Sequence, residues 1–404
     1  MTAAFSHLSV ELQTIAAAGL YRSRRVIDSP QGIYLQLEGR SIVNFCSNDY
    51  LGLANHPDVV SAFKAGVDQY GVGSGSAHLI CGHSRAHHAL EEELAAFTDR
   101  DRALLFSTGY MANVGVMSAL LGRGDAVFED RLNHASLLDG GLMSGARFKR
   151  YAHADVEQLK QQLARATGHK LIVTDGVFSM DGDFAPLKAL AALAESATTG
   201  LMVDDAHGLG VLGQKGGGLL DCLGLNQDDV PILMGTLGKS FGTFGAFIAG
   251  SDDLIETLIQ KARTYIYTTA LPAAVAEATR ASLKRVIADN WRRERLRSLA
   301  GRFRRGAEQL GLECGQSSGD SLEQNESLLS AIQPIIIGDS QRTVEISTRL
   351  LNAGFLVSAI RPPTVPKGGA RLRVTLSALH EEQHIDQLLV ALDQAINVSN
   401  VITP

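Results

Sequence analysis

The sequence predicts an α/β protein with a large domain, built on a mostly parallel sheet flanked by helices, and a smaller α+β domain at the C-terminus. Two observations lead to this fold class. Between residues 103 and 250, short runs that are apolar throughout alternate with segments of helical spacing, which is typical of buried parallel strands joined by helices. In addition, 404 residues with 45% apolar side chains are enough for two or three packed domains.

Five apolar runs are the expected strands of the large domain. We expect all five to be parallel, and they have the sequences ALLFS, KLIVT, LMVDD, PILMG and FGAFIAG. Helices should separate them. After ALLFS, for example, Tyr110, Val114, Met117 and Leu121 recur at helical spacing, as in a βαβ crossover.

The pattern changes in the C-terminal part of the chain. A long helix is expected from Ala273 to Leu310, and its arginines between Trp291 and Arg305 are interpreted as a solvated face, because the chain is acidic overall. The smaller domain then follows as a strand (AIQPIIIG), a helix (Thr343 to Ala353), two strands (FLVSAIR and ARLRVTLS) and a final helix.

These patterns give the expected domain boundaries. Residues 1–47 form an N-terminal segment, residues 48–285 the large domain and residues 286–404 the small domain. The polar segment from Gly315 to Ser327 is expected to be a surface loop, because it lacks any apolar periodicity.

Composition and charge exclude several classes of protein. A net charge of −6 gives no electrostatic reason to bind nucleic acid or an acidic membrane. The N-terminus has no basic start followed by an apolar run, and no stretch of about 18 apolar residues occurs. The cysteines are far apart and form no CxxC pair, which favours a reducing cytoplasm; they are Cys46, Cys81, Cys222 and Cys314.

Lys239 is the first candidate for chemistry. It lies in MGTLGKSFG, which resembles a phosphate-binding P-loop, but that motif needs glycine at position 233, where this chain has leucine. A lysine in a glycine-rich, apolar setting after a strand can lose its proton and form a Schiff base. A flexible surface lysine is the alternative if Lys239 stands alone.

Two further segments place polar groups at the ends of predicted strands. VDDAHG puts Asp204 and His207 at the carboxyl edge of the sheet, where α/β proteins bind ligands. A buried carboxylate needs a partner, and a protonated pyridine nitrogen is one such partner. In FSTGYMAN, the turn through Gly109 and Tyr110 opens a helix whose first N–H groups suit a phosphate.

Histidines form a separate question. His134 precedes a helical segment and could stack on a planar cofactor, although a lone histidine is more often structural. No metal is expected, because the chain has no HExxH motif; four other histidines are interpreted as surface residues, namely His78, His83, His87 and His88. The glycine-rich string GVGSGSAH lacks the full GxGxxG spacing, which argues against a dinucleotide cofactor.

Taken together, seven strings resemble the α-oxoamine synthases, a family of fold-type I enzymes that depend on pyridoxal 5'-phosphate (PLP). The strings are NFCSNDYLGL, FSTGYMANVG, DRLNHASLLDG, VTDGVFSMDGD, VDDAHGLGVLG, TLGKSFG and IRPPTVPKGGARLRVTLS, in this order over nearly the whole chain. The resemblance is greatest to the member that joins L-alanine to pimeloyl-CoA or a pimeloyl acyl-carrier protein in biotin biosynthesis, with loss of CO2. The alternatives are a sister activity such as glycine C-acetyltransferase, or a non-catalytic regulator of the same fold.

The resemblance implies roles for individual residues around PLP. Lys239 would carry the Schiff base, Asp204 would pair with the pyridine nitrogen, and His134 would stack on the ring and also donate a hydrogen bond to the substrate. Further contacts to the ring oxygen and the phosphate would come from Ser179, His207, Gly109, Tyr110, Thr236 and, from a second subunit, Thr268 or Thr269.

The resemblance also implies a cytoplasmic homodimer and a set of substrate contacts. Asn48 and one of two arginines, Arg373 or Arg361, would hold the amino-acid carboxylate, and Arg22 and Thr364 would also contact substrate. The chain departs from the family pattern at Ser76, Ala77 and His78, which makes the thioester side less well defined than the cofactor side.

Overall fold

The computed structural model describes residues 3–315 and 328–397, so all of the predicted polar loop after Gly315 lies outside the described residues. The described chain divides into two compact units. The large unit holds residues 48–297 and 328–331, and the small unit holds residues 3–47, 298–315 and 332–397. The N-terminal segment therefore clusters with the C-terminal residues, and the chain passes between units within α12 (Asn290–Gln309) rather than at residue 285.

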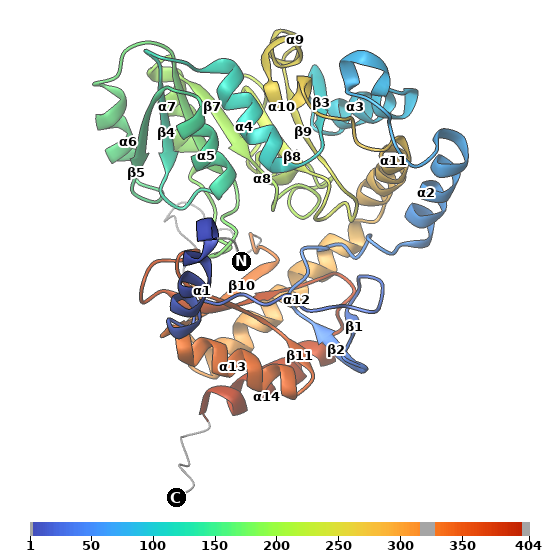
Figure 1. The fold of residues 1–404 in the computed structure, drawn as a ribbon, viewed down its shortest axis with the longest axis vertical. Helices are drawn as coiled ribbons and strands as arrows, with labels where there is room; N and C mark the ends of the chain where they lie inside the picture. Colours follow the sequence, from blue (N-terminus) through green and yellow to red (C-terminus); the bar gives the residue numbers. More distant parts are fainter. Residues whose placement is uncertain (1–2, 316–327, 398–404) are drawn as a thin grey trace, which may run out of the picture. The chain divides into compact units, whose positions relative to one another are not determined.

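A seven-stranded sheet forms the centre of the large unit (Figure 1). Its spatial order is β3-β9-β8-β7-β6-β4-β5. The strands are β3 (Arg102–Phe106), β4 (Ala126–Asp130), β5 (Arg147–Tyr151), β6 (Lys170–Asp175), β7 (Gly200–Asp204), β8 (Ile232–Thr236) and β9 (Ala246–Gly250). The mostly parallel sheet is confirmed, but the prediction that FGAFIAG is parallel is wrong. This strand, β9, is antiparallel to both β3 and β8, because the short segment 237–245 leaves no room for a crossover helix.

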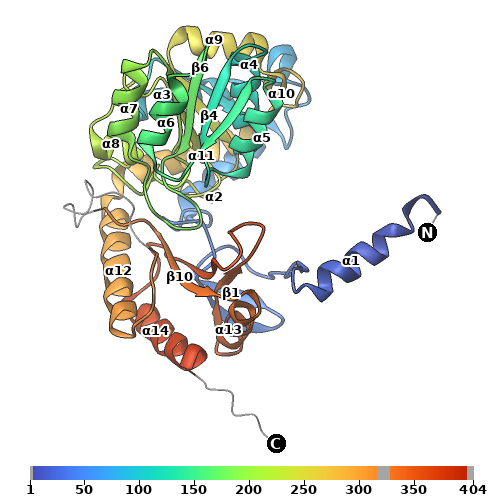
Figure 2. The same ribbon diagram turned by 90° about the vertical axis from the view of Figure 1, so that its left-hand side faces the viewer.

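Helices cover both faces of this sheet. Figure 2 shows α4 (Gly109–Leu120) and α5 (Ala135–Met143) on one face, and α6 (Val156–Leu163) and α7 (Leu187–Ser196) on the other. The remaining helices of the unit are α2 (Pro57–Tyr70), α3 (Arg85–Phe97), α8 (Gly218–Leu223), α9 (Asp252–Lys261), α10 (Arg263–Ile266) and α11 (Ala273–Ala288), with a π-helical turn at His78–Gly82.

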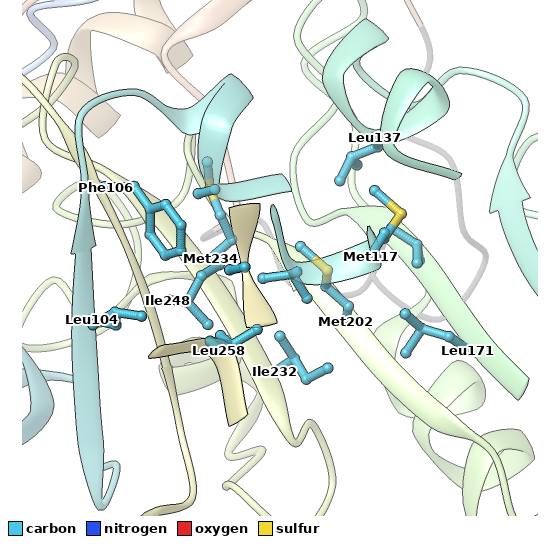
Figure 3. Close-up of a cluster of buried hydrophobic side chains, with 14 of the residues drawn as sticks. Leu104, Phe106, Met117, Leu137, Leu171, Met202, Ile232, Met234, Ile248 and Leu258 are labelled. Carbon is cyan, nitrogen blue, oxygen red and sulfur yellow. The ribbon is translucent and has the colours of Figure 1, made fainter. Parts of the chain in front are cut away.

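Side chains alternate between two apolar cores along each strand. In β3, Leu104 and Phe106 pack in the core beneath α4 and α5 (Figure 3), whereas Leu105 packs in the core beneath α3 and α11. The exception is the edge strand β5, which carries the exposed Arg147 and Arg150; the other strands are buried on both faces, which explains why they are largely apolar.

The small unit contains two three-stranded sheets. One has the order β1-β2-β11 and the other β10-β13-β12. The elements are α1 (His7–Ala17), β1 (Tyr34–Leu37), β2 (Arg40–Asn44), β10 (Ile332–Gly338), α13 (Ser340–Asn352), β11 (Phe355–Leu356), β12 (Ser358–Ile360), β13 (Ala370–Thr375) and α14 (Glu382–Asn397), preceded by a 3₁₀ turn at Ala3–Phe5. The predicted strand FLVSAIR is therefore two strands, because the chain leaves one sheet and joins the other at the buried Val357.

The long C-terminal helix of the large unit is also interrupted. Helix α11 ends at Ala288, Asp289 leaves helical geometry, and α12 begins at the next residue. The interpretation of a solvated arginine face is wrong for Arg292 and Arg293, which are buried and donate hydrogen bonds to backbone carbonyls of Leu51 and Val286. Among the described residues, we find no helix with the length and apolar character needed to cross a bilayer.

Candidate active site

The carboxyl edge of the large sheet gathers the chemically competent side chains. Strands β6, β7 and β8 are parallel neighbours, with Asp175 paired to Asp204 and Asp204 paired to Met234 in the ladder. Parallel strands end at the same edge, so Asp175, Asp204 and the residues after Met234 meet there. The sequence places Asp204 at this edge correctly, whereas Asp175, directly after the predicted strand KLIVT, is not among the predicted site residues.

A chain of hydrogen bonds leads from Lys239 into the large unit. The Nζ atom of Lys239 lies 2.7 Å from Nε2 of His207, and Nδ1 of His207 lies 2.6 Å from the hydroxyl oxygen of Tyr50. The Tyr50 hydroxyl donates to Oδ1 of Asn48 at 3.2 Å. If Lys239 donates to Nε2, the Nδ1 proton of His207 faces Tyr50, and the four groups form one continuous donor series.

The turn between β8 and β9 positions Lys239. The backbone N–H groups of Leu237 and Thr243 donate to the carbonyls of Gly245 and Leu237, and the Gly242 N–H donates to the Lys239 carbonyl at 2.8 Å. Gly242 has a φ of 64°, and a Cβ at this position would lie 2.3 Å from the backbone nitrogen of Ala54. Glycine is thus required there for both conformation and space.

A second network holds Asp204 and His134. Both Asp204 oxygens accept hydrogen bonds, one from Nδ2 of Asn113 at 2.8 Å and one from the Ala206 N–H at 3.0 Å. The same Asn113 amide donates to the Ser136 hydroxyl, which lies 2.7 Å from Nδ1 of His134. His134 is exposed at the N-terminus of α5, so its ring is accessible to a ligand.

Burial makes this edge strongly favourable for a cation. Desolvation, reinforced by the charge of Asp204, holds the pKa of Asp175 well above its usual value. Desolvation also raises the pKa of Asp205 to about 8, against hydrogen bonds from backbone N–H groups that lower it. Because three carboxyl groups crowd into one buried region, a positively charged ligand atom near Asp204 would be stabilised there.

The N-terminus of α4 offers an anion site at the same edge. Thr108 caps the helix by accepting from the Met111 N–H, which leaves the first N–H groups, those of Gly109 and Tyr110, without a preceding turn. A Cβ on Gly109 would lie 2.6 Å from the Met234 side chain, so the backbone approaches β8 closely. Thr236 ends that strand, and its hydroxyl lies 3.4 Å from the Gly238 nitrogen.

The other predicted cofactor residues lie on loops of the large unit. Ser179 is half-buried in the loop after β6. Thr268 is half-buried and Thr269 is exposed between α10 and α11, where the Ser107 hydroxyl donates to the Thr269 carbonyl at 3.4 Å. Thr269 is therefore accessible at the surface of the single chain.

Four predicted substrate residues belong to the small unit instead. Arg373 is buried on β13 and donates to the Thr375 hydroxyl at 3.0 Å, whereas the half-buried Arg361 donates to the Gly19 carbonyl. Arg22 and Thr364 are exposed. Of the predicted substrate residues, only Asn48 and His134 lie in the same unit as Lys239.

The interpretation of four surface histidines is wrong for two of them. His78 and His87 are buried, because the π-helical turn folds His78 against Tyr265 and α3 begins beside it. Ring nitrogens of His78, His83 and His87 lie within 4.8 Å of one another. In His87, however, Nδ1 accepts from the Ser84 N–H and Nε2 lies 2.7 Å from the Leu271 carbonyl, so this ring offers no lone pair to a metal.

Sequence reasoning missed three members of the site. Tyr50, Asn113 and Ser136 each lie inside a string that was singled out, namely NFCSNDYLGL, FSTGYMANVG and DRLNHASLLDG. Their roles depend on contacts across the fold, such as Asn113 with Asp204, which are distant in the sequence. In the sequence, the one signal for these three residues is that they lie inside the strings that resemble the family.

Comparison with known proteins identifies the family. The profile of the family "Aminotransferase class I and II" matches residues 40–392. A protein from Thioalkalivibrio sulfidiphilus named 8-amino-7-oxononanoate synthase is 60% identical over 394 residues, which cover 97% of this chain and 98% of the relative. A protein of the same name from Methylococcus capsulatus is 61% identical, with 95% and 97% covered.

Solved structures show the same fold. A serine palmitoyltransferase from S. paucimobilis, determined with bound PLP and myriocin, matches with a TM-score of 0.90 and 30% identity, covering 98% of both chains. An 8-amino-7-oxononanoate synthase from Francisella tularensis matches with a TM-score of 0.75 and 32% identity, covering 88% of this chain and 98% of the other.

Proposed function

Because the chain belongs to the aminotransferase class I and II family and to the 8-amino-7-oxononanoate synthases within it, we propose that it condenses L-alanine with a pimeloyl thioester. The products would be 8-amino-7-oxononanoate, CO2 and the free thiol of CoA or of an acyl-carrier protein. The observation that carries this proposal is the Lys239 amine beside His207, on the same sheet edge as the buried Asp204.

The residues at this edge fit PLP. Lys239 supplies an amine, Asp204 supplies a buried carboxylate for a protonated ring nitrogen, and the α4 N-terminus supplies N–H groups for the phosphate. Within the described residues, Oδ1 of the buried Asn113 has no hydrogen-bond partner, so the network around Asp204 still has an acceptor available for a ligand. When bound, PLP supplies an electron sink for the bonds around the amino-acid α-carbon.

The side chains have distinct tasks in this reaction. Asp204 would keep the ring nitrogen charged, with its own orientation held by Asn113 and the Ala206 N–H. Lys239, once free, would remove the α-proton of alanine, and His207 is within hydrogen-bond distance to orient its amine. His134 would stack on the ring and donate a hydrogen bond to the oxygen that gains charge at the thioester carbonyl.

Substrate binding draws on the small unit as well. We propose that Asn48 and either Arg373 or Arg361 hold the carboxylate of alanine, with Arg22 and Thr364 as further substrate contacts. An arginine can hold a carboxylate through two parallel hydrogen bonds. Arg373 is the better placed of the two on local grounds, because β12 and β13 fix its backbone on the central strand of a sheet.

We also propose that the protein works as a cytoplasmic homodimer. Thr268 or Thr269 of one subunit would reach the phosphate bound by the other, which agrees with the exposure of Thr269. All four cysteines are free thiols, as is usual in a reducing compartment.

Release of thiol by the PLP-loaded protein tests the proposed reaction. The comparison uses L-alanine with pimeloyl-CoA, glycine with acetyl-CoA, and L-serine with palmitoyl-CoA, the last because of the similarity to serine palmitoyltransferases. We expect release with the first pair, and none from the Lys239→Ala variant. Release only with another pair would move the protein to a sister activity, and no release in a protein that binds PLP would point to a carrier-protein donor or to a non-catalytic role.

A further inference from the structure

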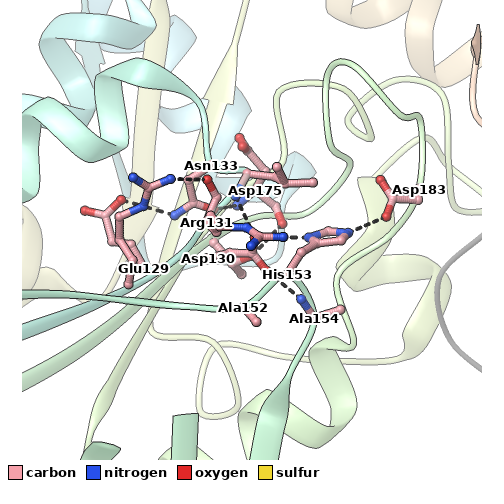
Figure 4. Close-up of polar contacts among 12 residues, drawn as sticks. Glu129, Asp130, Arg131, Asn133, Ala152, His153, Ala154, Asp175 and Asp183 are labelled. Carbon is pink, nitrogen blue, oxygen red and sulfur yellow. Dashed lines mark hydrogen bonds and ion pairs between the residues drawn. The ribbon is translucent and has the colours of Figure 1, made fainter. Parts of the chain in front are cut away.

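His153 lies between two buried carboxylates at the end of β5 (Figure 4). Its Nδ1 is 3.0 Å from Oδ1 of Asp130 and its Nε2 is 2.6 Å from Oδ2 of Asp183. Burial alone would lower the pKa of His153, but the two hydrogen bonds and the charges of both carboxylates outweigh it and raise the pKa to about 10. Both ring nitrogens therefore donate, and the ring is an imidazolium.

The two carboxylates belong to different parts of the large unit. Asp130 ends β4, and its oxygens also accept from the N–H groups of Leu132 and Ala154. Asp183 lies in the loop 176–185, which connects β6 to the segment before α7. His153 is thus a bridge between the sheet and this loop.

The loop 176–185 is closed on itself and carries Ser179. The Phe178 N–H donates to the Asp183 carbonyl at 3.0 Å, and the Gly182 N–H donates to the Phe178 carbonyl at 2.8 Å. At its base, the Gly176 N–H donates to the Asp204 carbonyl at 2.8 Å. The loop therefore begins at the backbone of Asp204, and Ser179 follows three residues after Gly176.

His153 holds this loop in two ways. Besides the ion pair with Asp183, the rings of His153 and Phe178 meet edge to face, with 4.4 Å between their centroids and 89° between their planes. An edge-to-face arrangement is a favourable geometry for two packed rings. The residues that His153 contacts, Phe178 and Asp183, lie before and after Ser179 in the sequence.

We propose that His153 is a positioning residue that, by joining Asp130 to Asp183 and packing on Phe178, fixes the loop 176–185 so that Ser179 contacts the cofactor. The contact of Ser179 rests on the proposed function. His153 itself touches no reacting atom in this account, because both of its nitrogens are engaged by the two carboxylates. A neutral replacement would remove the positive charge between two buried carboxylates and loosen the loop.

The test uses three variants and one control. His153→Gln removes the positive charge of the imidazolium, and Asp183→Asn removes the carboxylate on the loop. The double variant removes both of these charges and leaves only the Asp130 carboxylate of the original three groups. The control is Arg100→Gln, because Arg100 is a buried cation that donates to the Val230 carbonyl before the amino end of β3, away from the carboxyl edge.

Hydrogen–deuterium exchange of residues 176–185 in the apoprotein measures directly how firmly His153 holds this loop. We expect His153→Gln to speed exchange of this segment by about 10-fold or more, while the β6 strand keeps its protection. The double variant should recover part of that protection, because no carboxylate remains on the loop to be desolvated without a cation. Arg100→Gln should lower the unfolding midpoint without changing exchange in the segment.

PLP affinity and steady-state kinetics measure how the position of the loop affects cofactor binding and turnover. We expect His153→Gln to raise the Kd for PLP by about 10-fold and to lower kcat more than it raises KM, because substrate contacts lie elsewhere. A lower unfolding midpoint with unchanged loop exchange would overturn the proposal, and so would faster exchange with unchanged PLP affinity. If neither wild type nor Arg100→Gln binds PLP, the proposed function fails, while the exchange data still decide whether His153 fixes the loop.

Discussion

The two compact units bury opposite kinds of charge. Among the described residues of the large unit, buried carboxylates outnumber buried arginines, and several cluster at the carboxyl edge of the sheet, including Asp175, Asp204 and Asp205. In the described part of the small unit, no aspartate or glutamate is buried, whereas Arg371 and Arg373 are. The ionisable side chains that the described chain buries are therefore mainly acidic in the large unit and basic or histidine in the small unit.

Two histidines, the half-buried His153 and the buried His380, show a similar contrast. His153 in the large unit lies between carboxylates, which raise its pKa to about 10. His380 in the small unit stacks on Phe45, with 4.3 Å between ring centroids, and burial lowers its pKa to about 4. His153 is therefore held as a cation, whereas the His380 ring is neutral.

Loss of the amine from the carboxylate-rich edge should have the largest effect. We expect Lys239→Ala to lower kcat by on the order of 10⁴-fold or more, because on the proposed mechanism it removes both the covalent anchor and the proton acceptor. The visible absorbance of lysine-bound PLP should vanish as well. Thiol release and an absorbance spectrum check this, and a variant that keeps both would show that another group provides the chemistry.

The next effect concerns the carboxylate itself. Asp204→Asn keeps the shape and the hydrogen bond from the Ala206 N–H but removes the charge that we propose to face the ring nitrogen. We expect kcat to fall on the order of 10²- to 10³-fold, with folding retained. Asp205→Asn is the matched control, since Asp205 is equally buried but accepts from the Leu219 N–H instead. Equal losses in both variants would contradict a specific role for Asp204.

The next prediction concerns the arginines of the small unit as ligands for the alanine carboxylate. If the buried Arg373 holds the alanine carboxylate, Arg373→Ala should raise KM for L-alanine by about 10- to 100-fold, the value of a charge-assisted hydrogen bond. Arg361→Ala should change it less. Steady-state kinetics with varied alanine measure both, and the reverse order would assign the carboxylate to Arg361.

The smallest effects should appear in stability against pH. His153 has a raised folded pKa, so its stabilisation is complete below about pH 6.5 and is lost as the pH rises toward 10. His380 has a lowered folded pKa, so its stabilisation is present above about pH 6.5 and is lost as the pH falls toward 4.

Urea denaturation of two variants tests these opposite signs. We expect the destabilisation by His153→Gln to be larger at pH 6 than at pH 9 by more than about 1 kcal/mol, and that by His380→Gln to be larger at pH 8 than at pH 5. If the destabilisation changed with pH in the same direction for both variants, His153 and His380 would not have opposite pKa shifts.

Much of the large unit is predictable because its signals are local. A strand buried on both faces is apolar throughout, so β6, β7 and β8 are evident, and polar residues directly after them mark the carboxyl edge. The antiparallel direction of β9 is not a property of its own residues, because it depends on pairing with β3 and β8. The same holds for Asn113, which is a site residue only through its contact with Asp204.

The small unit is harder to predict for a physical reason. Its strands β11 and β12 have only 2 and 3 residues, and the switch between sheets at Val357 leaves no mark in an apolar run. Long-range contacts are equally hidden in one part of the large unit, where the burial of Arg292 and Arg293 depends on carbonyl oxygens of Leu51 and Val286 that the helical pattern of arginines does not reveal. Charged residues at helical spacing usually indicate a helix face in contact with solvent. Whether such a face is buried instead depends on tertiary contacts.

The most direct test of the account is to locate the covalent attachment of PLP. The apoprotein is loaded with PLP, reduced with borohydride, digested and examined by mass spectrometry. We predict a pyridoxyl group on Lys239 alone, with loss of labelling in Lys239→Ala and normal labelling in Arg373→Ala. Labelling of a different lysine, or none in a protein that still folds, would contradict the assignment of the carboxyl edge as the active site.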